Sequence, residues 1–557
     1  MDRVHVPEGR EDSPFVRAHR DELFPVLTPA QVDRIAPFAH ERRFADGESL
    51  WEAGDRGISF FVVLEGGIAI LTGADDLVTV HRLREFSGDV DLLSGRPVNV
   101  RGRARGATRV LEVASARFRA LVQTDAGIGE TLLRAFLMRR VALMVAGLGS
   151  VVLIGSRFSA GTLALQEFLS RNSIPFANLD VDRDADIQKT LESFGVGVDD
   201  VPVVICRGTR VLRKPTIEEV GDCLGLNALN EDVVRDVVVV GAGPAGLASA
   251  LYAASEGLDV LVLEASAPGG QAGSSTRIEN YLGFPSGISG QLLASRALVQ
   301  AQKFGAELAV ARTATRLDCD RRPYRLEVGD TRVSAKTVII ATGVQYRKPD
   351  IPDLARFVGV GLYFGATPLE GVLCAGEEVV VVGGANSAGQ AAVYLAGVAR
   401  RVTMLVRGTG LAETMSRYLI RRIEETPNIR LLTRTRITAL AGEGHLERVT
   451  WEGPDGRATD ENVRHVFLMT GADPNTTWLQ NCVALDTKGF VKTGPDLGAA
   501  ELAAARWPLP RPPMLFETTL PGVFAVGDVR ASSVKRVAAA VGEGSVCVQL
   551  VHKVLAE

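Results

Sequence analysis

A glycine-rich turn at residues 241–246, with the sequence Gly-Ala-Gly-Pro-Ala-Gly, follows a run of four valines. Glycines at such a turn let the backbone approach a pyrophosphate at the N-terminus of the next helix. Glu264 ends the next apolar run, about 20 residues further on, where a carboxylate can accept hydrogen bonds from a ribose diol. These features predict an adenine dinucleotide site whose binding residues are Gly241, Gly243, Pro244, Ala245, Gly246 and Glu264.

A second turn at residues 383–388 follows the valine-rich run at 379–382. Ala385 replaces its middle glycine, which adds a methyl group where a pyrophosphate comes close. Arg407 follows the next predicted strand, and a cation there favours the 2′-phosphate of NADPH over the ribose of NADH. The sequence therefore predicts an NADPH site that contains Gly383, Asn386, Ser387 and Arg407.

Further segments extend this pattern: Pro-Gly-Gly-Gln at 268–271, Ile-Glu-Asn-Tyr at 278–281, Ile-Ala-Thr-Gly at 340–343 and the run at 522–530 that contains Gly-Asp. With them, the chain from about residue 235 to 557 resembles the thioredoxin reductase family, which binds FAD and NADPH. The resemblance implies that Gln271 and Asn280 lie along the FAD, that Thr342 and Gly343 mark the crossing between domains, and that Asp528 binds the ribitol chain. It adds as cofactor-binding residues Gly270, Gly527, Lys535, Arg536 and Val537, the last three near the flavin ring.

The dithiol of that family is missing. Residues 365–368 read Gly-Ala-Thr-Pro where the resemblance implies Cys-Ala-Thr-Cys, and neither glycine nor proline can exchange electrons with a disulfide. Cys374 is expected to be an incidental thiol in a surface turn. No catalytic nucleophile, metal site or structural disulfide framework is predicted from the six cysteines, which are Cys206, Cys223, Cys319, Cys374, Cys482 and Cys547.

Residues 1–147 contain short β-like runs with glycine turns, which predict a β-roll followed by helices. This part resembles a cyclic nucleotide-binding domain whose phosphate cassette corresponds to residues 86–100. The family uses a glutamate on the ribose and an arginine on the cyclic phosphate, whereas this chain has Asp89 and Val98. Arg96 or Arg101 could substitute, and the open alternatives are a cyclic nucleotide, another effector, or a scaffold that only packs against its neighbour.

Residues 148–228 are predicted to form a thioredoxin-like domain, with strands at 151–154, 176–180 and 201–205 and a helix at 161–170. Val201-Pro202 would supply its cis-proline turn. The segment 156–162 lies where such a domain carries its Cys-x-x-Cys motif and has no cysteine. The domain is expected to be a spacer or a docking surface for a partner or a small thiol.

The predicted fold class is α/β multidomain, with two Rossmann-like three-layer dinucleotide-binding domains after the β-roll and the thioredoxin-like domain. The FAD-binding domain covers 235–352 and 477–557, and the NADPH-binding domain covers 353–476. A net charge of −4 with interspersed signs gives no basic tract for nucleic acid. The longest apolar stretch, 141–155, is shorter than the ~20 residues that span a bilayer, and no secretory signal begins the chain, so a cytoplasmic location is expected.

The resemblance implies a homodimeric oxidoreductase that transfers hydride from NADPH to FAD. Without the dithiol, the electrons would pass to an external acceptor: a disulfide, a low-molecular-weight thiol, a ferredoxin-like carrier, a quinone or oxygen. One alternative is an effector-responsive redox regulator with little turnover. Another is true thioredoxin reductase activity through cysteines that folding brings together, with Cys374 as the best candidate.

Overall fold

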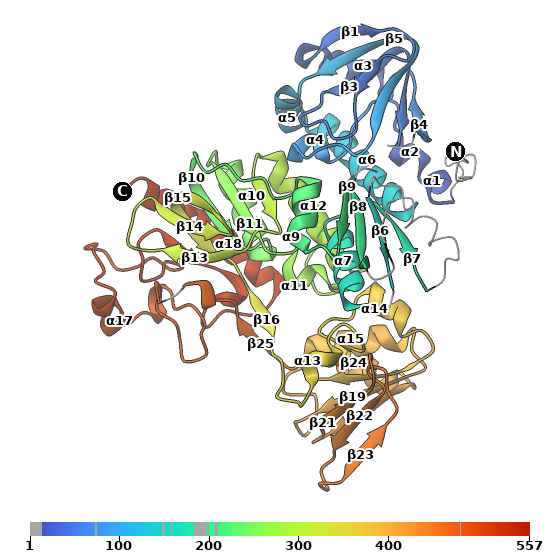
Figure 1. Cartoon of the computed structure of the whole chain (residues 1–557). Helices are drawn as coiled ribbons and strands as arrows, with labels where there is room; N and C mark the ends of the chain where they lie inside the picture. Colours follow the sequence, from blue (N-terminus) through green and yellow to red (C-terminus); the bar gives the residue numbers. More distant parts are fainter. Residues whose placement is uncertain are drawn as a thin grey trace.

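The computed structural model describes residues 14–72, 75–146, 151–156, 159–182, 197, 200–206, 210–479 and 481–557. The chain forms four regions with their own sheets, and the fourth region, in yellow and orange, interrupts the third region, in light green and red (Figure 1). The fold is α/β and multidomain, as predicted. Each sheet forms where short apolar runs alternate with glycine-containing turns in the sequence.

The first region is a β-roll with helices packed on it (Figure 1). Its sheet has the order β1-β5-β3-β4, and β2 pairs with β5. A cluster of aromatic rings, Phe60, Phe86, Phe118 and Phe136, fills the space between the sheet and helices α5 and α6. The elements are α1 (Pro14–Ala18), α2 (Arg20–Leu23), α3 (Pro29–Ile35), β1 (His40–Phe44), β2 (Ser49–Trp51), β3 (Phe60–Leu71), β4 (Leu77–His81), α4 (Asp91–Ser94), β5 (Arg101–Val113), α5 (Ser115–Thr124) and α6 (Ala126–Val145).

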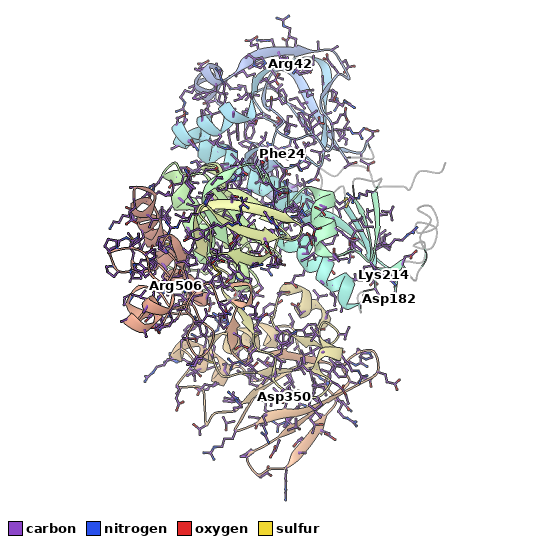
Figure 2. All side chains as sticks on the ribbon, turned by 60° about the vertical axis from the view of Figure 1, so that its left-hand side comes forward. Phe24, Arg42, Asp182, Lys214, Asp350 and Arg506 are labelled. Atoms are coloured by element: carbon purple, nitrogen blue, oxygen red, sulfur yellow. A yellow bond between two sulfur atoms is a disulfide. The ribbon has the colours of Figure 1, made fainter. Side chains whose placement is uncertain are left out.

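The second region, which carries Asp182 and Lys214 in Figure 2, has a four-stranded sheet of order β7-β6-β8-β9. Strand β6 is parallel to β7 and antiparallel to β8. The Val201-Pro202 peptide is cis, as predicted. Residues 157–158 of the cysteine-free segment lie outside the described residues. The elements are β6 (Val151–Gly155), α7 (Ala160–Arg171), β7 (Phe176–Asp180), β8 (Val203–Cys206), β9 (Arg210–Arg213) and α9 (Ile217–Leu224).

The third region is built on a sheet of order β12-β11-β10-β15-β14-β13, with β26 also paired to β15. Valines alternate along β10, so Val237 and Val239 pack under helices α10 and α18, whereas Val238 and Val240 face the β13–β15 meander. The helices, the sheet around β10 and the β13–β15 meander thus form three layers. The elements are β10 (Val234–Val240), α10 (Pro244–Ser255), β11 (Val260–Glu264), α11 (Gly270–Gly273), α12 (Gly290–Lys303), β12 (Glu307–Val310), β13 (Ala314–Asp318), β14 (Tyr324–Val328), β15 (Thr331–Ile340), α17 (Ala499–Ala504), β26 (Val523–Ala525) and α18 (Val537–Leu555).

The fourth region, drawn in yellow and orange in Figure 1, has a parallel sheet of order β17-β24-β18-β19-β20. Strands β16 and β25 pair with each other where the chain leaves the third region and returns to it. The elements are β16 (Val344–Tyr346), α13 (Leu354–Phe357), β17 (Leu362–Tyr363), α14 (Pro368–Leu373), β18 (Glu378–Val382), α15 (Asn386–Ala396), β19 (Arg401–Val406), α16 (Arg417–Glu425), β20 (Ile429–Thr433), β21 (Arg436–Ala441), β22 (Arg448–Glu452), β23 (Ala458–Glu461), β24 (His465–Leu468) and β25 (Ala472–Pro474).

The regions share apolar contacts. Leu224 and Leu226, at the end of the second region, pack with Val310 and Ala311 of the third region in one buried cluster. Val299 of α12 belongs to the buried cluster of the β-roll. Within the described residues, no helix has the length and apolar character that a membrane crossing requires.

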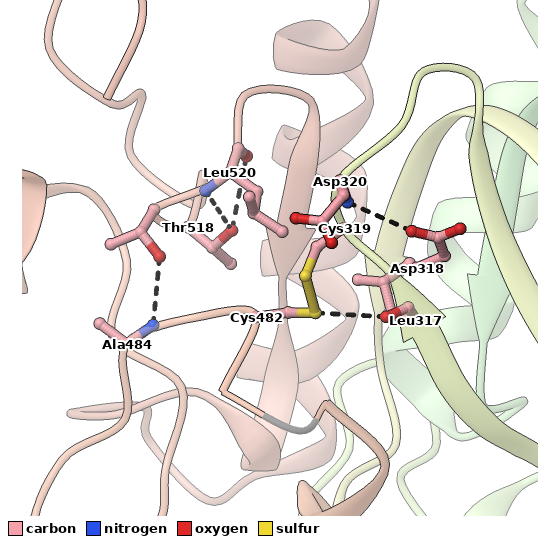
Figure 3. The surroundings of a disulfide bond; sticks show 9 residues. Leu317, Asp318, Cys319, Asp320, Cys482, Ala484, Thr518 and Leu520 are labelled. Atoms are coloured by element: carbon pink, nitrogen blue, oxygen red, sulfur yellow. Dashed lines mark hydrogen bonds between the residues drawn. A yellow bond between two sulfur atoms is a disulfide. The ribbon is translucent and has the colours of Figure 1, made fainter. Parts of the chain in front are cut away.

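A disulfide joins Cys319, which follows β13, to Cys482, with 5.8 Å between the Cα atoms (Figure 3). It closes a separation of 163 residues that contains the whole fourth region. The prediction of no structural disulfide is therefore wrong. The two cysteines meet only because the chain returns beside the β13–β15 meander after completing the fourth region, and sequence spacing does not report such a meeting.

Cys374 is also placed differently from the prediction. Its side chain is fully buried just beyond α14, among the apolar residues that cover the sheet of the fourth region. Burial raises the pKa of the Cys374 thiol to about 12, with smaller contributions from Glu370 and Glu377. A thiol that is neither ionised nor accessible is inert as a redox group.

A dinucleotide cavity between the third and fourth regions

A cavity of about 1130 Å³ lies at the carboxyl ends of the parallel strands of the third region and reaches the fourth region. Crevices at this edge of an open α/β sheet are the usual place for nucleotide ligands. Most of the residues predicted to bind cofactors line it: Gly241, Gly243, Pro244, Ala245, Glu264, Gly270, Gln271, Thr342, Gly343, Ser387, Asp528, Lys535, Arg536 and Val537.

The first glycine turn is shaped as the sequence predicts. Gly241 has a φ of +104°, and a Cβ atom there would lie 2.4 Å from the Ala341 carbonyl oxygen. A Cβ atom at Gly246 would lie 1.8 Å from the Gly241 carbonyl oxygen, so glycine is needed for α10 to pack against the strand. Gly243 instead faces the cavity, where a Cβ atom would have Gly270 Cα as its nearest neighbour at 3.9 Å. This space at the N-terminus of α10 fits a pyrophosphate.

Glu264 is held by the backbone around it. Its carboxylate accepts hydrogen bonds from the N–H groups of Ala242 at 2.7 Å, Ser266 at 2.9 Å and Ala267 at 3.1 Å. The residue is 9% exposed, and burial raises its pKa although these donors oppose the shift. The carboxylate is thereby fixed beside the cavity, where its remaining acceptor capacity suits ribose hydroxyl groups.

The opposite end of the cavity lies at the start of α18. Gly527 does not line the cavity. It has a φ of +73° and donates its N–H to Glu543 at 2.7 Å, which stabilises the turn before α18. Burial raises the pKa of Asp528, an effect that Lys535 reduces. The Lys535 ammonium donates to the Asp528 carbonyl oxygen and lies 4.4 Å from the centre of the Phe490 ring. Burial lowers the pKa of Lys535.

The crossing between the regions is fixed by paired hydrogen bonds. The Thr342 hydroxyl donates to the Asn475 carbonyl at 2.8 Å, and the Asn475 amide donates to the Thr342 carbonyl at 2.9 Å. The Gln271 amide donates to the Val344 carbonyl at 2.5 Å. Gln271 therefore ties the third region to the start of β16 at the wall of the cavity.

Several predicted residues lie outside this cavity. Asn280 and Arg407 are exposed. Asn386 begins α15, and its side-chain oxygen accepts from the Ser416 N–H at 2.8 Å. A Cβ atom at Gly383 would lie 2.5 Å from the Met469 carbonyl oxygen, so this glycine allows a close strand-to-helix turn. Of the second turn, only Ser387 reaches the cavity, because that turn belongs to the separate sheet of the fourth region.

Helix α7 of the second region forms part of the cavity wall, which the sequence did not indicate. Arg171 at its end donates from Nη2 to the Gly270 carbonyl at 2.7 Å, while its buried Nε atom has no partner in the described structure. Its charge partly offsets the rise in the pKa of Glu264. Asn172 donates to the Ser266 carbonyl at 3.0 Å, and Gln291 donates to the Arg171 carbonyl at 2.9 Å. No local motif marks Arg171, because it reaches the site only through tertiary packing.

The place of the missing dithiol also lies at this cavity. Gly365, Thr367 and Glu370 line it, and no cysteine belongs to its described lining. Glu370 accepts a hydrogen bond from the Thr367 N–H at 2.8 Å. Burial raises the pKa of Glu370, and the nearby Glu167 charge on α7 adds to the shift. Neither group can exchange electrons as a thiol pair does.

Among the described residues, no group of three or more His, Cys, Asp and Glu side chains could hold a metal ion.

Comparison with known proteins agrees with this geometry. Residues 41–125 match the cyclic nucleotide-binding domain. The thioredoxin reductase of Bacillus subtilis (strain 168) is 30% identical over 332 residues, which are 59% of this chain and 97% of that protein. The NADPH-dependent thioredoxin reductase 3 of Arabidopsis thaliana is 29% identical over 362 residues, which are 61% of this chain and 64% of that protein.

Two solved structures resemble the same part of the chain. The thioredoxin reductase of Lactococcus lactis has a TM-score of 0.52 and 27% identity, and the match covers 58% of this chain and 99% of that one. That of T. acidophilum has a TM-score of 0.52 and 26% identity, with the same coverage. The predicted resemblance to thioredoxin reductases is confirmed. Residues 235–544, more than half of the sequence, match the pyridine nucleotide-disulphide oxidoreductase family, and the chain therefore belongs to that family.

Proposed function

We propose that this chain is an NADPH-dependent FAD oxidoreductase that passes its electrons to an acceptor outside the chain. In this proposal, residues 235–352 and 477–557 bind FAD and residues 353–476 bind NADPH. Residues 1–147 and 148–228 form a cyclic nucleotide-binding-like domain and a thioredoxin-like domain without a redox dithiol. The strand order β7-β6-β8-β9, with the cis Val201-Pro202 peptide, supports the last assignment.

The cavity fits FAD on three independent observations. The Gly243 turn leaves space at the N-terminus of α10 for a pyrophosphate, and Glu264 is fixed for a ribose diol. The buried Nε–H of Arg171 has no partner in the described structure, so it can donate to a phosphate oxygen that lies near Gly270. We therefore assign Arg171 to the FAD site together with the residues predicted from the sequence.

Bound FAD and NADPH would supply hydride transfer, and the chain's residues bind and orient the two cofactors. Glu264 and the first turn hold the adenosine end, while Asp528, Lys535 and Arg536 surround the other end of the FAD cavity. Helix α7 covers the cavity on one side and limits access of water. Asn386 and Arg407 would hold NADPH on the outer side of the fourth region, with Arg407 directed to the 2′-phosphate.

The lack of a redox thiol in the described cavity lining supports an external acceptor. Gly365 and Thr367 lie at this wall, no described lining residue is a cysteine, and Cys374 is buried as an inert thiol. The chain's own groups therefore offer no thiol relay at the cavity. The acceptor is a small redox protein, a disulfide compound, a quinone or oxygen that approaches the cavity from outside.

The test is to mix the purified flavoprotein with NADPH without oxygen and follow the flavin absorbance, and then to repeat the experiment with NADH. Rapid bleaching by NADPH, and slower bleaching by NADH, is the expected result. An acceptor screen with a quinone, ferricyanide and a thioredoxin disulfide would then identify the acceptor class. A flavin that stays oxidised with both nucleotides would overturn the enzyme assignment and favour a regulatory role.

A further inference from the structure

The β-roll contains a second cavity, separate from the dinucleotide cavity, of about 120 Å³. Its wall is mostly apolar, and the polar side chains that line it include His81, Asp89 and Arg139. Trp51, Ile70 and Leu143 contribute apolar surface from two strands and from helix α6. Phe24, which also lines it, lies at the base of the roll (Figure 2).

The size of this cavity restricts its occupant. A cavity of about 150 Å³ lined by apolar side chains can hold a benzene molecule. The volume of about 120 Å³ is of the same order, so it suits an occupant of about one six-membered ring. A cyclic nucleotide, which combines a base, a ribose and a cyclic phosphate, is larger than this inner volume.

Arg139 gives the cavity a buried positive charge. The residue is 7% exposed, and its Nε and Nη1 atoms donate to the carbonyl oxygens of Leu23 at 2.8 Å and Gly88 at 2.9 Å. Its Nη2 atom is buried and has no hydrogen-bond partner in the described structure. The guanidinium also lies 4.7 Å from the centre of the Phe86 ring. A buried cation with an unused donor is stabilised when an anion binds to it.

The carboxylates of Glu85 and Asp89 act on the Arg139 charge only from a distance. Asp89 and Asp91 both accept from Nη2 of Arg140, each at 2.6 Å, and no described carboxylate lies within ion-pair distance of Arg139. Burial lowers the pKa of Arg139 to about 10, although Glu85 and Asp89 oppose the shift, so the guanidinium stays charged at neutral pH.

His81 supplies a second polar group to the wall. It is 3% exposed, and its Nδ1 atom has no partner in the described structure. Burial and the Arg139 charge lower the pKa of His81, so its ring is neutral and can donate a hydrogen bond without adding charge. The cavity therefore offers one cation and one neutral donor to a small anion, and the Asp89 carboxylate in the same wall is paired with Arg140 at 2.6 Å.

The cyclic-phosphate chemistry expected of such a roll is absent from this described wall. Val98 lines the cavity where the family has an arginine. Arg101 pairs with Asp75 at 2.8 Å, and Arg96 lines a different groove, so neither supplies the missing charge here. The cation comes instead from α6, which lines the cavity together with the strands.

We propose that the β-roll cavity binds a monocyclic aromatic carboxylate. Its carboxylate accepts hydrogen bonds from Nη2 of Arg139 and from His81, and its ring lies against Trp51 and Ile70. This site goes beyond the proposed oxidoreductase function, because it would hold an effector in a domain separate from the flavin. Of the three alternatives left open for residues 1–147, the proposal selects an effector other than a cyclic nucleotide.

The test uses 4-fluorobenzoate as the probe and observes its fluorine resonance by NMR with the full-length protein. Arg139→Gln removes the cation, while Arg134→Gln on the same helix, an exposed residue paired with Glu130, serves as the matched control. Ala142→Phe fills the cavity and keeps Arg139. Circular dichroism and the melting temperature report whether each variant is folded. Cyclic AMP and uncharged 4-fluorobenzyl alcohol are the competing ligands.

We expect saturable binding at one site, which Arg139→Gln weakens about tenfold to hundredfold and Arg134→Gln leaves unchanged. Ala142→Phe should abolish it, and cyclic AMP should not displace the probe. The proposal is overturned if 4-fluorobenzoate does not bind, if cyclic AMP displaces it, or if the uncharged alcohol binds equally well. Should Arg139→Gln fail to fold, unchanged binding to folded Ala142→Phe would overturn it as well.

Discussion

At the scale of single residues, we propose that FAD binding depends on Arg171, a side chain from outside the dinucleotide fold. It lines the FAD cavity, donates to the Gly270 carbonyl and keeps one buried donor for the ligand. A guanidinium is suited to phosphate because its planar donors match two oxygen atoms.

Replacing Arg171 by Gln should therefore weaken FAD binding by about tenfold or more, since a hydrogen bond to a charged group contributes about 1.5–3 kcal/mol. The dissociation constant is measured from the quenching of FAD fluorescence on adding the apoprotein. Lys214→Gln, exposed on the same region, is the control and should bind FAD like the unchanged protein. Equal affinity of Arg171→Gln and the control would remove Arg171 from the site.

Thiol reactivity gives a second prediction at this scale. Cys374 and Cys547 are fully buried, and burial raises the pKa of both thiols. Because alkylation requires an accessible thiolate, native protein treated with iodoacetamide at neutral pH should carry no label on either residue. Mass spectrometry after rapid digestion checks this, with urea-unfolded protein as the positive control. Prompt labelling of Cys374 in the native protein would make it a candidate redox group again.

At the scale of elements, the sequence predicted the features that neighbouring residues determine, such as strands and glycine turns. The valine runs form β10 and β18, and Gly241 and Gly383 adopt the positive φ values that their turns require. The sequence could not reveal Arg171 in the cavity wall, the Cys319–Cys482 pair or the burial of Cys374. These three depend on which distant elements pack together, and no spacing rule reports that.

The disulfide between the β13–β15 meander and the returning chain should stabilise the third region. A cross-link that closes about 100 residues removes about 4.7 kcal/mol of chain entropy from the unfolded state, and this one spans 163 residues. Cys319→Ala should lower the melting temperature of the oxidised protein, as followed by calorimetry. In the presence of a strong thiol reductant, the variant and the unchanged protein should differ far less. A variant that melts like the unchanged oxidised protein would show that the bond carries no stability.

At the scale of the whole molecule, the second region packs against the third region and covers its cavity. Leu224 and Leu226 cover Val310 and Ala311 at the edge of the third region, and α7 covers the dinucleotide cavity. A truncated chain that starts at residue 235 would expose this apolar edge and lose Arg171. It should bind less FAD, as measured by the ratio of flavin absorbance to protein absorbance. It should also aggregate, as measured by light scattering. If the truncated protein is monodisperse and fully occupied by FAD, the second region is not needed for solubility or for FAD binding.

The flavin is proposed to be the only redox group between NADPH and the external acceptor, and the electron capacity of the protein tests this most directly. An anaerobic titration with dithionite counts the electrons that the protein takes up per FAD. We expect one two-electron equivalent to reduce the flavin completely, because neither the described cavity wall nor a buried thiol supplies a second acceptor. Uptake of two equivalents would contradict this claim, because it would show that a disulfide, with Cys319–Cys482 as the pair to examine, exchanges electrons with the flavin.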